Sequence, residues 1–456
     1  MFFCYLHCMA AKNKLGLFSL TMIVIGLVIG MGIFRTSKDA ANAALTPSIF
    51  FAAWIIGGLV AFCGALTYAE IGSRYPVTGG YYKIFSYAYH PSVAFAINCI
   101  ILISNAASLS GVALIGSEYI APLIFHSGTT DFIKALIAMS AIIIFYGVNL
   151  MGLRMSSQTQ NVLMLIKIAM LVVLISSVFF PQLYNTTPQP AIDLRTISFG
   201  TILLSFGIAL KATSFTYGGY QQTINFGEEI EKPKKNIPRG IFIGILVIVS
   251  LYLLASYAYY KVIGFHDLKY PDPSSPGIAA IIAEKMFGPV GKYVSSVLLF
   301  IAVLAYVNVL LLSNPRVMYA MSEDGILPKT FQKKDEKKDV LTISLTVFAA
   351  VCVIVLFFAK KFNEILSFTI FLDSIGMATS AATIFILRKR TKHLDGSGIF
   401  SMKLYPLLPL IFIITYLFVG TVIAIEDYKY AVIGISVFTG FLLLYFLTKK
   451  FRKQKV

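Results

Sequence analysis

Residues 26 to 34 read GLVIGMGIF and lie inside a long apolar run near the start of the chain. The run is long enough to cross a bilayer, whose hydrocarbon core of about 30 Å needs about 20 helical residues. Yet Gly26, Gly30 and Gly32 fall within it, and each glycine weakens a helix by about 1 kcal/mol relative to alanine. Non-helical backbone at this depth is tolerated only against protein or a water-filled cavity. The stretch therefore predicts either close helix packing through small residues or a helix interrupted beside a cavity.

The composition of the whole chain is that of a membrane protein. Its 456 residues are 57% hydrophobic, with a mean hydropathy of +0.80. The hydropathy rule predicts about twelve spans. They are expected at residues 16–38, 47–72, 92–120, 132–151, 156–180, 197–227, 238–263, 290–322, 340–359, 362–388, 403–424 and 428–448. Arg154 and the polar sequence SSQTQ (156–160) are expected to mark the turn between spans four and five.

The distribution of lysine and arginine predicts the orientation. Basic residues gather on every second loop, on the N-terminal tail (1–15) with Lys12 and Lys14, and on the C-terminal tail KKFRKQKV (449–456). The positive-inside rule places these segments, and so both termini, in the cytoplasm. The net charge of +17 is therefore interpreted as a topology signal, and no nucleic-acid partner is expected.

Several function classes lack their sequence signals. The five cysteines are scattered without a CxxC pair, and the five histidines fall in tails, loops or interfaces, so neither a metal site nor a disulfide framework is predicted. No phosphate-binding loop GxxxxGK[ST] occurs, which argues against an ATPase. We expect no cofactor and no enzyme activity. No cleavable signal peptide is predicted, and translation from Met1 or from Met9 is left open.

The second half of the chain repeats the feature with which the first half begins. Its first span contains SFTYGGYQQT, with Gly218 and Gly219 inside it. Glycine-interrupted spans at corresponding positions of two halves indicate a transporter with inverted repeats and a binding site near the bilayer midplane. This predicts an all-α polytopic membrane protein of about 12 transmembrane helices. Its segments would be a first repeat (16–180), a second repeat (197–388) and two appended spans (403–448).

Four motifs resemble one known family, in its order and spacing, between about residues 16 and 390. They are GLVIGMGIFRT (26–36), ALTYAEIGSRYPVTGGYYKIF (65–85), FTYGGYQQTINFGEEIEKPKKNIPRGI (215–241) and LLSNPRVMYAMSEDGILP (311–328). These are similar to the first, second, sixth and eighth helices of the amino acid–polyamine–organocation (APC) superfamily. The YGG pattern most resembles the L-type amino acid transporters and their bacterial relatives, while NPRVMYAMSEDG leans toward the cationic branch. Met31 replaces the family's usual serine, and Tyr220 stands where the L-type pattern has tryptophan.

The resemblance implies the LeuT-like five-plus-five inverted repeat with helices 1 and 6 broken. It implies an amino acid permease of the plasma membrane that works by alternating access, on neutral L-amino acids. Sodium-independent exchange and proton coupling both stay open, as do a cationic amino acid or polyamine transporter and a transport-like sensor. Eukaryotic L-type relatives attach a glycoprotein through a cysteine after span three. Residues 121–131 contain no cysteine, so no disulfide-linked heavy subunit is expected.

A broken helix would read the amino acid scaffold through its backbone. The substrate carboxylate would lie on the amides around Gly30, Met31 and Gly32, where the helix dipole is positive. Its ammonium would lie on carbonyls near the breaks, and the resemblance makes Phe215 an aromatic lid. The complete predicted set is Val28, Ile29, Gly30, Met31, Gly32, Ile33, Phe215, Thr216, Tyr217 and Gly218.

Charged residues within the spans are functional-site hypotheses, because they are costly in a membrane. The resemblance makes Lys167 a replacement for a bound sodium ion, hydrogen-bonded to carbonyls near Gly26 and span eight. Burial disfavours a charged amine, so Lys167 could also release a proton during transport; a purely structural lysine is the alternative. A buried pair is predicted between Lys211 and Asp373. An inner gate, or only an interfacial ion network, is predicted for Glu70, Glu228, Glu229 and Arg316.

Overall fold

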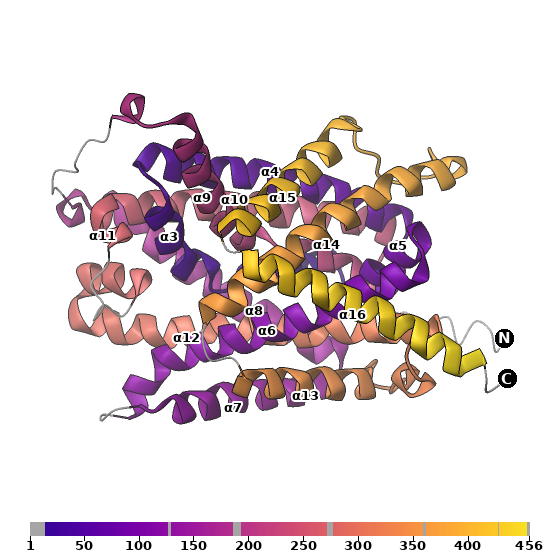
Figure 1. Cartoon of the computed structure of the whole chain (residues 1–456). Coiled ribbons are helices and arrows are strands. Elements are labelled where there is room, and N and C mark those ends of the chain that lie inside the picture. The colour runs from indigo at the N-terminus through magenta and orange to yellow at the C-terminus, as the bar shows by residue number, and fades with distance from the viewer. Residues whose placement is uncertain are drawn as a thin grey trace.

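The computed structural model describes residues 14–125, 129–185, 193–270, 277–358, 362–426 and 428–453. These ranges form helices joined by turns and loops, with three isolated β-bridges and no extended strand. Figure 1 shows most of the long helices running side by side in alternating directions. The all-α architecture predicted from the sequence is confirmed.

The twelve predicted spans are all present, and we number them in chain order. In the described ranges ten are long and apolar enough to cross a membrane, and two are shorter apolar helices. They are span 1 (α2, Leu17–Val28, with α3, Gly32–Ala43), span 2 (α4, Pro47–Arg74), span 3 (α6, Pro91–Ile124), span 4 (α7, Asp131–Leu150), span 5 (α8, Leu153–Ser176), span 6 (α9, Phe199–Tyr217), span 7 (α10, Pro233–Val262), span 8 (α12, Ile278–Glu323), span 9 (α13, Thr342–Phe358), span 10 (α14, Phe362–Arg390), span 11 (α15, Leu407–Glu426) and span 12 (α16, Tyr428–Lys453).

Two glycines with positive φ set span boundaries, and one of these boundaries differs from the sequence prediction. The turn between spans 4 and 5 is at Gly152, whose φ of 123° suits a residue without Cβ, so the polar residues 156–160 lie inside α8 and not in the turn. Within α12, Gly288 has a φ of 68° and separates a short outer helix from the spanning part, which begins near the predicted residue 290.

Contacts between spans repeat with a shift of five, as an inverted repeat requires. Spans 1, 2, 3 and 4 each pack against their counterparts 6, 7, 8 and 9. Span 3 packs against spans 4, 9 and 10, and span 8 correspondingly against spans 9, 4 and 5. Figure 1 shows one such pair, α7 with α13, along one edge of the molecule. Because five is odd, the second set of spans crosses in the opposite sense to the first. The exact residue bounds of the two repeats stay a prediction.

Spans 1 and 6 are the two broken ones, as predicted. Helix α2 ends at Val28, Ile29 adopts φ −75° and ψ 81°, and α3 begins at Gly32. Helix α9 ends at Tyr217, and the chain continues through the 3₁₀ helix η4 (Tyr220–Asn225). Gly219 joins these two parts with a φ of 117°, and a Cβ there would lie 2.1 Å from the carbonyl oxygen of Leu27. The two breaks therefore touch, backbone against backbone.

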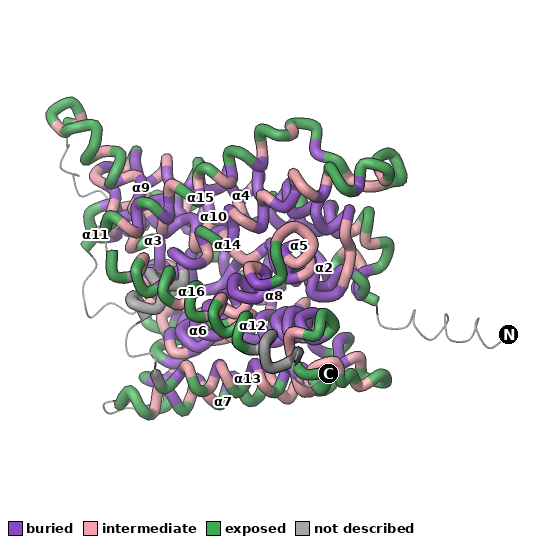
Figure 2. Tube along the Cα trace, turned by 45° about the vertical axis from the view of Figure 1, so that its right-hand side comes forward, coloured by how far each residue is buried: buried purple, intermediate pink, exposed green. Residues whose placement is uncertain are grey.

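The opening stretch serves both of its predicted purposes, at different glycines. At Gly26, inside α2, a Cβ would lie 2.0 Å from Nε2 of Gln160 on α8, so this glycine permits close packing of spans 1 and 5. Gly30 and Gly32 belong to the break. Figure 2 shows buried residues at the centre of the molecule and exposed residues along the outer helices. Exposed apolar side chains such as Ile143 and Ile144 on α7 form the surface suited to lipid.

Candidate substrate site

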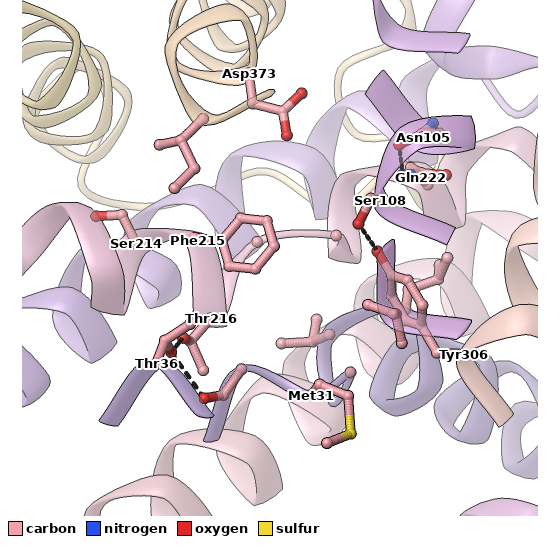
Figure 3. Close-up of a pocket in the computed structure, with 18 of the residues that line it drawn as sticks. Met31, Thr36, Asn105, Ser108, Ser214, Phe215, Thr216, Gln222, Tyr306 and Asp373 are labelled. Carbon is pink, nitrogen blue, oxygen red and sulfur yellow. Dashed lines mark hydrogen bonds between the residues drawn. The ribbon is translucent and has the colours of Figure 1, made fainter. Parts of the chain in front are cut away.

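One cavity lies where the two broken spans meet. Helices α3, α6, α9, α12, α14 and α15 contribute to its wall. Figure 3 shows side chains of α3, α6, α9, α12 and α14 around it. Its lining consists of Leu27, Val28, Gly30, Met31, Gly32, Arg35, Thr36, Asn105, Ser108, Val112, Ser214, Phe215, Thr216, Gly218, Gly219, Gln221, Gln222, Tyr306, Ile370, Asp373, Met377 and Tyr416.

The break in span 1 presents backbone donors. Phe34 N and Arg35 N donate to the carbonyl oxygen of Met31, at 3.1 and 3.0 Å, and so begin the hydrogen bonding of α3. Within the described ranges, the amides of Met31, Gly32 and Ile33 have no acceptor. Such unpaired amides at a helix N-terminus carry partial positive charge and suit a carboxylate.

Gly30 differs from its neighbours in this respect. Its amide donates to the carbonyl oxygen of Val28 at 2.8 Å, so the donor expected at Gly30 is already used in this conformation. The free donors begin one residue later than the sequence suggested.

The outer halves of spans 1 and 6 pack so closely that Gly32 has no room for a side chain. A Cβ at Gly32 would lie 2.7 Å from Cγ2 and 2.8 Å from Oγ1 of Thr216. The hydroxyls of Thr36 and Thr216 are 2.5 Å apart, and Thr36 also donates to the carbonyl oxygen of Gly32 at 2.7 Å. This contact fixes α3 against α9 beside the free amides.

Lys167 reaches the inner side of the same break. Its side chain is buried, and Nζ donates to the carbonyl oxygen of Ile29 at 2.5 Å. The acceptor is therefore Ile29, rather than Gly26 or a carbonyl of α12 as expected from the sequence. The Lys167 amine thus lies at the C-terminal end of α2, where the negative end of the helix dipole favours a cation.

Most of the predicted scaffold residues come together at the cavity, although substrate binding by them stays a prediction. Seven line it: Val28, Gly30, Met31, Gly32, Phe215, Thr216 and Gly218. Ile29 and Ile33 do not line it, and their side chains are buried in the core. Tyr217 turns away, and its hydroxyl donates to the carbonyl oxygen of Trp54 at 3.2 Å.

The aromatic ring of Phe215 projects into the cavity, in the centre of the view in Figure 3. Its position agrees with a lid over a ligand at the broken helix. The lid role itself stays a prediction.

Polar residues on span 3, on η4 and on span 8 form a part of the wall that sequence reasoning missed. Gln222 Nε2 donates to Oδ1 of Asn105 at 3.1 Å, and Asn105 Nδ2 donates to Oδ1 of Asn314 at 2.6 Å. The hydroxyls of Ser108 and Tyr306 are 2.8 Å apart. Buried amides in otherwise apolar helices were the available signal, because burying them is unfavourable unless they are hydrogen-bonded.

The predicted pair between Lys211 and Asp373 is wrong. Lys211 instead forms an ion pair with Glu426 at the end of α15, and its side chain is mostly buried there. Asp373 lines the cavity from α14, and no described residue donates a hydrogen bond or forms an ion pair with it. Periodicity could place both residues within spans, but it does not show which face of each helix meets which neighbour.

Glu70 belongs to a buried ion network on the side predicted to be cytoplasmic. Its carboxylate accepts from Arg74 Nε at 2.7 Å, from Arg388 Nε and Nη2 at 2.7 Å each, and from the Met402 amide at 2.9 Å. The network ties span 2 to the end of span 10 and to the segment before span 11.

Glu229 and Arg316 form a second ion pair on the same side of the molecule. Arg316 Nε and Nη2 lie 2.7 and 2.6 Å from Oε2 of Glu229, and the guanidinium lies 4.4 Å from the ring centroid of Phe226. The backbone carbonyl of Glu229 also accepts from the Leu15 amide at 2.7 Å. Burial raises the pKa of the Glu229 carboxyl, and the charge of Arg316 offsets part of that rise.

The fold and the cavity define a class of protein: a secondary transporter with inverted repeats and two broken helices that meet at a central site. The chain belongs to the amino acid permease family, whose model matches residues 15–447. It is accordingly a multi-pass membrane transporter of amino acids and not an enzyme.

Individual relatives are distant but cover most of the chain. The serine/threonine exchanger SteT of Bacillus subtilis is 26% identical over 418 residues, which are 90% of each protein. The b(0,+)-type amino acid transporter 1 of Mus musculus is 25% identical over 96% of this chain and 88% of its own length. The large neutral amino acids transporter small subunit 2 of Oryctolagus cuniculus is 24% identical over 90% of this chain and 75% of its own length.

Proposed function

We propose that this permease carries amino acids by alternating access without sodium, preferentially as an exchanger. The observation that carries the proposal is the break in span 1. Its free amides at Met31 and Gly32 and the Lys167 ammonium at Ile29 lie on the two ends of one interruption.

The amides and carbonyls at the breaks would bind the part common to all amino acids. The α-carboxylate accepts from the amides of Met31, Gly32 and Ile33 at the positive end of α3. The α-ammonium lies on carbonyls at the end of α9, with Phe215 and Thr216 as candidates. The carbonyl of Val28, predicted for this role, already accepts from the Gly30 amide and from the Tyr252 hydroxyl. The carbonyl of Ile29, predicted for the same role, already accepts from Lys167.

Lys167 gives the reason to propose sodium independence. A cation at the C-terminal end of α2 stabilises the freed carbonyl there and occupies the position where a sodium ion would bind. If Lys167 stays charged through the cycle, transport is exchange; if it releases its proton, transport is coupled to protons. A relative named as an exchanger supports the first alternative.

The substrate class has two candidates. Relatives named for serine and threonine and for large neutral amino acids support neutral substrates. The carboxylate of Asp373 in the cavity wall favours amino acids with a basic side chain.

The ion pair of Glu229 and Arg316 would close the cytoplasmic side. It connects the segment after span 6 to span 8, while the bond between Leu15 and Glu229 adds the start of span 1. We place this closure, and both termini, in the cytoplasm, with the chain in the plasma membrane, because the basic loops lie on that side of the fold. The network around Glu70 is peripheral to the cavity and serves as a structural tie.

Flux into reconstituted vesicles tests this proposal. Vesicles preloaded with unlabelled amino acid should accumulate labelled substrate faster than empty vesicles, and replacing sodium by choline should change nothing. An absolute requirement for sodium would refute the sodium-free mechanism. Tight binding without any flux would instead identify a sensor.

A further inference from the structure

Asp373 is the acidic residue of the cavity wall, and within the described ranges it lacks a partner of opposite charge. Its carboxylate points from α14 toward the cavity in Figure 3, on the side opposite Met31 and Thr36. Two basic residues within the spans have other partners: Lys211 pairs with Glu426, and Lys167 donates to Ile29.

Arg35 is the basic residue of the cavity lining, and it is also engaged. Its Nη1 lies 3.1 Å from Oε2 of Glu118 on α6, with both side chains partly exposed. Within the described lining, the charge of Asp373 is therefore left without a counter-ion. A carboxylate held inside a membrane without a cation is costly, and such residues characteristically meet their partner in a bound ligand.

The surroundings of Asp373 suit the rest of a long basic side chain. Phe215, Ile370 and Met377 are apolar neighbours in the lining, and Tyr416 adds an aromatic ring. Methylene groups pack against such a surface while a terminal cation reaches a polar group beyond them. Aromatic rings at the same place also attract a passing ammonium or guanidinium group.

We propose that Asp373 binds the side-chain ammonium or guanidinium of a substrate, so that amino acids with a basic side chain are substrates of this protein. The inference rests on the proposed function, since it uses the substrate orientation set by the amides of Met31 and Gly32. With the α-carboxylate there, the side chain extends past Phe215 toward Asp373. Asp373 is then a residue that selects the substrate, separate from the backbone groups that hold the scaffold.

The assignment is tested by measuring how unlabelled amino acids inhibit the uptake of labelled substrate in the wild type and in an isosteric variant of Asp373. Asp373→Asn keeps the shape of the side chain and removes its charge, and Asp131→Asn makes the same chemical change at a fully exposed position on α7, far from the cavity. Inhibition is measured with lysine, ornithine, 2,4-diaminobutyrate and arginine, and with serine, leucine and phenylalanine as neutral competitors. Norleucine, which has the stem of lysine without its ammonium, isolates the charge.

In the wild type, the basic series should inhibit with a clear optimum of chain length. Asp373→Asn should weaken the best basic competitor by about tenfold or more, as expected for the loss of one partner of a desolvated charge pair, while neutral competitors change little. Asp131→Asn should resemble the wild type. Equal weakening of neutral and basic competitors, or none, would overturn the assignment: the first result would place Asp373 at the α-ammonium, the second away from the substrate.

The two proposals fail in distinguishable ways. If neutral amino acids are exchanged but basic ones neither compete nor enter, only the role of Asp373 is refuted. If no amino acid binds or enters vesicles with a folded wild-type protein, the proposed function itself is refuted.

Discussion

Of the two glycines in the span 1 break, Gly32 leaves less room for a side chain than Gly30. A Cβ there would overlap Thr216, whereas a Cβ at Gly30 would lie 3.3 Å from the ring of Tyr306, a contact that a small shift can relieve. The two positions, two residues apart, should therefore respond differently to the same substitution.

We predict that Gly32→Val abolishes substrate binding in a protein that still inserts and folds. Gly32→Ala should already lower affinity by about tenfold, as overpacking of a close contact typically costs about 1–3 kcal/mol. Gly30→Ala should cost less, and Gly30→Val should also abolish binding because its branched side chain enters the cavity. Labelled-substrate binding on protein that elutes as a single species in detergent measures this. Near-normal affinity in Gly32→Val would contradict a backbone-built site.

Lys167 is the second residue with a specific expectation. Lys167→Ala leaves the carbonyl of Ile29 without its donor in a buried site, at about 1–3 kcal/mol. We expect at least about a tenfold loss of transport. Flux of wild type and variant is compared with and without sodium and with and without an inward proton gradient.

An unimpaired Lys167→Ala variant would remove the lysine from the mechanism. If sodium rescues the variant, the ion occupies the place vacated by the ammonium. A rise of wild-type uptake with the proton gradient would select proton coupling over exchange.

At the scale of the elements, we predict that the segment after η4, which contains Glu229, closes the cytoplasmic side in a pH-dependent way. Burial raises the pKa of Glu229 in the closed arrangement, and the charged groups nearest to it are Arg316, Lys334 and Asp339. When the cytoplasmic side opens, water reaches the carboxyl and its pKa returns toward the ordinary value. The closed arrangement therefore binds a proton more tightly, and falling pH favours it over the open one.

Acidifying the cytoplasmic side should accordingly slow labelling of a cavity cysteine by a membrane-impermeant reagent added there. The measurement uses Ser108→Cys in a background without the native cysteines. Glu229→Gln, which does not titrate, should lose most of this pH dependence. Faster labelling at low pH would show that the charged ion pair with Arg316, and not the protonated carboxyl, holds the closed arrangement. An unchanged profile in Glu229→Gln would contradict a closing role for this carboxyl.

The elements themselves were largely predictable from the sequence, but their mutual faces were not. Apolar runs gave all twelve spans, and Gly30, Gly32, Gly218 and Gly219 marked both breaks, because membrane helices must satisfy their backbone internally. Two hydrogen bonds at the break were not predictable, because composition does not encode local geometry. They are the bond from the Gly30 amide to Val28 and the bond from Lys167 to the carbonyl of Ile29.

The wrong pairing of Asp373 with Lys211, and the oversight of Asn105 and Gln222, also have physical reasons. Asp373 and Lys211 were recognised as costly charges, yet pairing them required the rotation of α9, α14 and α15 about their axes. Hydrophobic periodicity does not define that rotation in a helix that is apolar on all sides. Asn105 and Gln222 were overlooked because a neutral amide hardly lowers the hydropathy of a span.

At the scale of the whole molecule, the prediction concerns its partners. Within the described ranges, Cys63 and Cys352 are buried and Cys99 is half-buried, and residues 121–131 contain no cysteine. We expect no disulfide-linked heavy subunit. The protein purified from native membranes under non-reducing conditions should migrate on a gel as it does after reduction. A heavier band that disappears on reduction would overturn this expectation.

The amides at the start of α3 have an evolutionary consequence. Every residue type except proline supplies the same N–H, so substitutions of side chains leave the reading of the α-carboxylate chemically intact wherever the backbone path survives. Selectivity, by contrast, resides in side chains such as the one at position 373, each a single codon change away from another chemistry. Because the backbone binds the scaffold and side chains select the substrate, a lineage can acquire new substrates and still bind amino acids. It agrees with relatives that share about a quarter of their residues with this chain and are named for different amino acids.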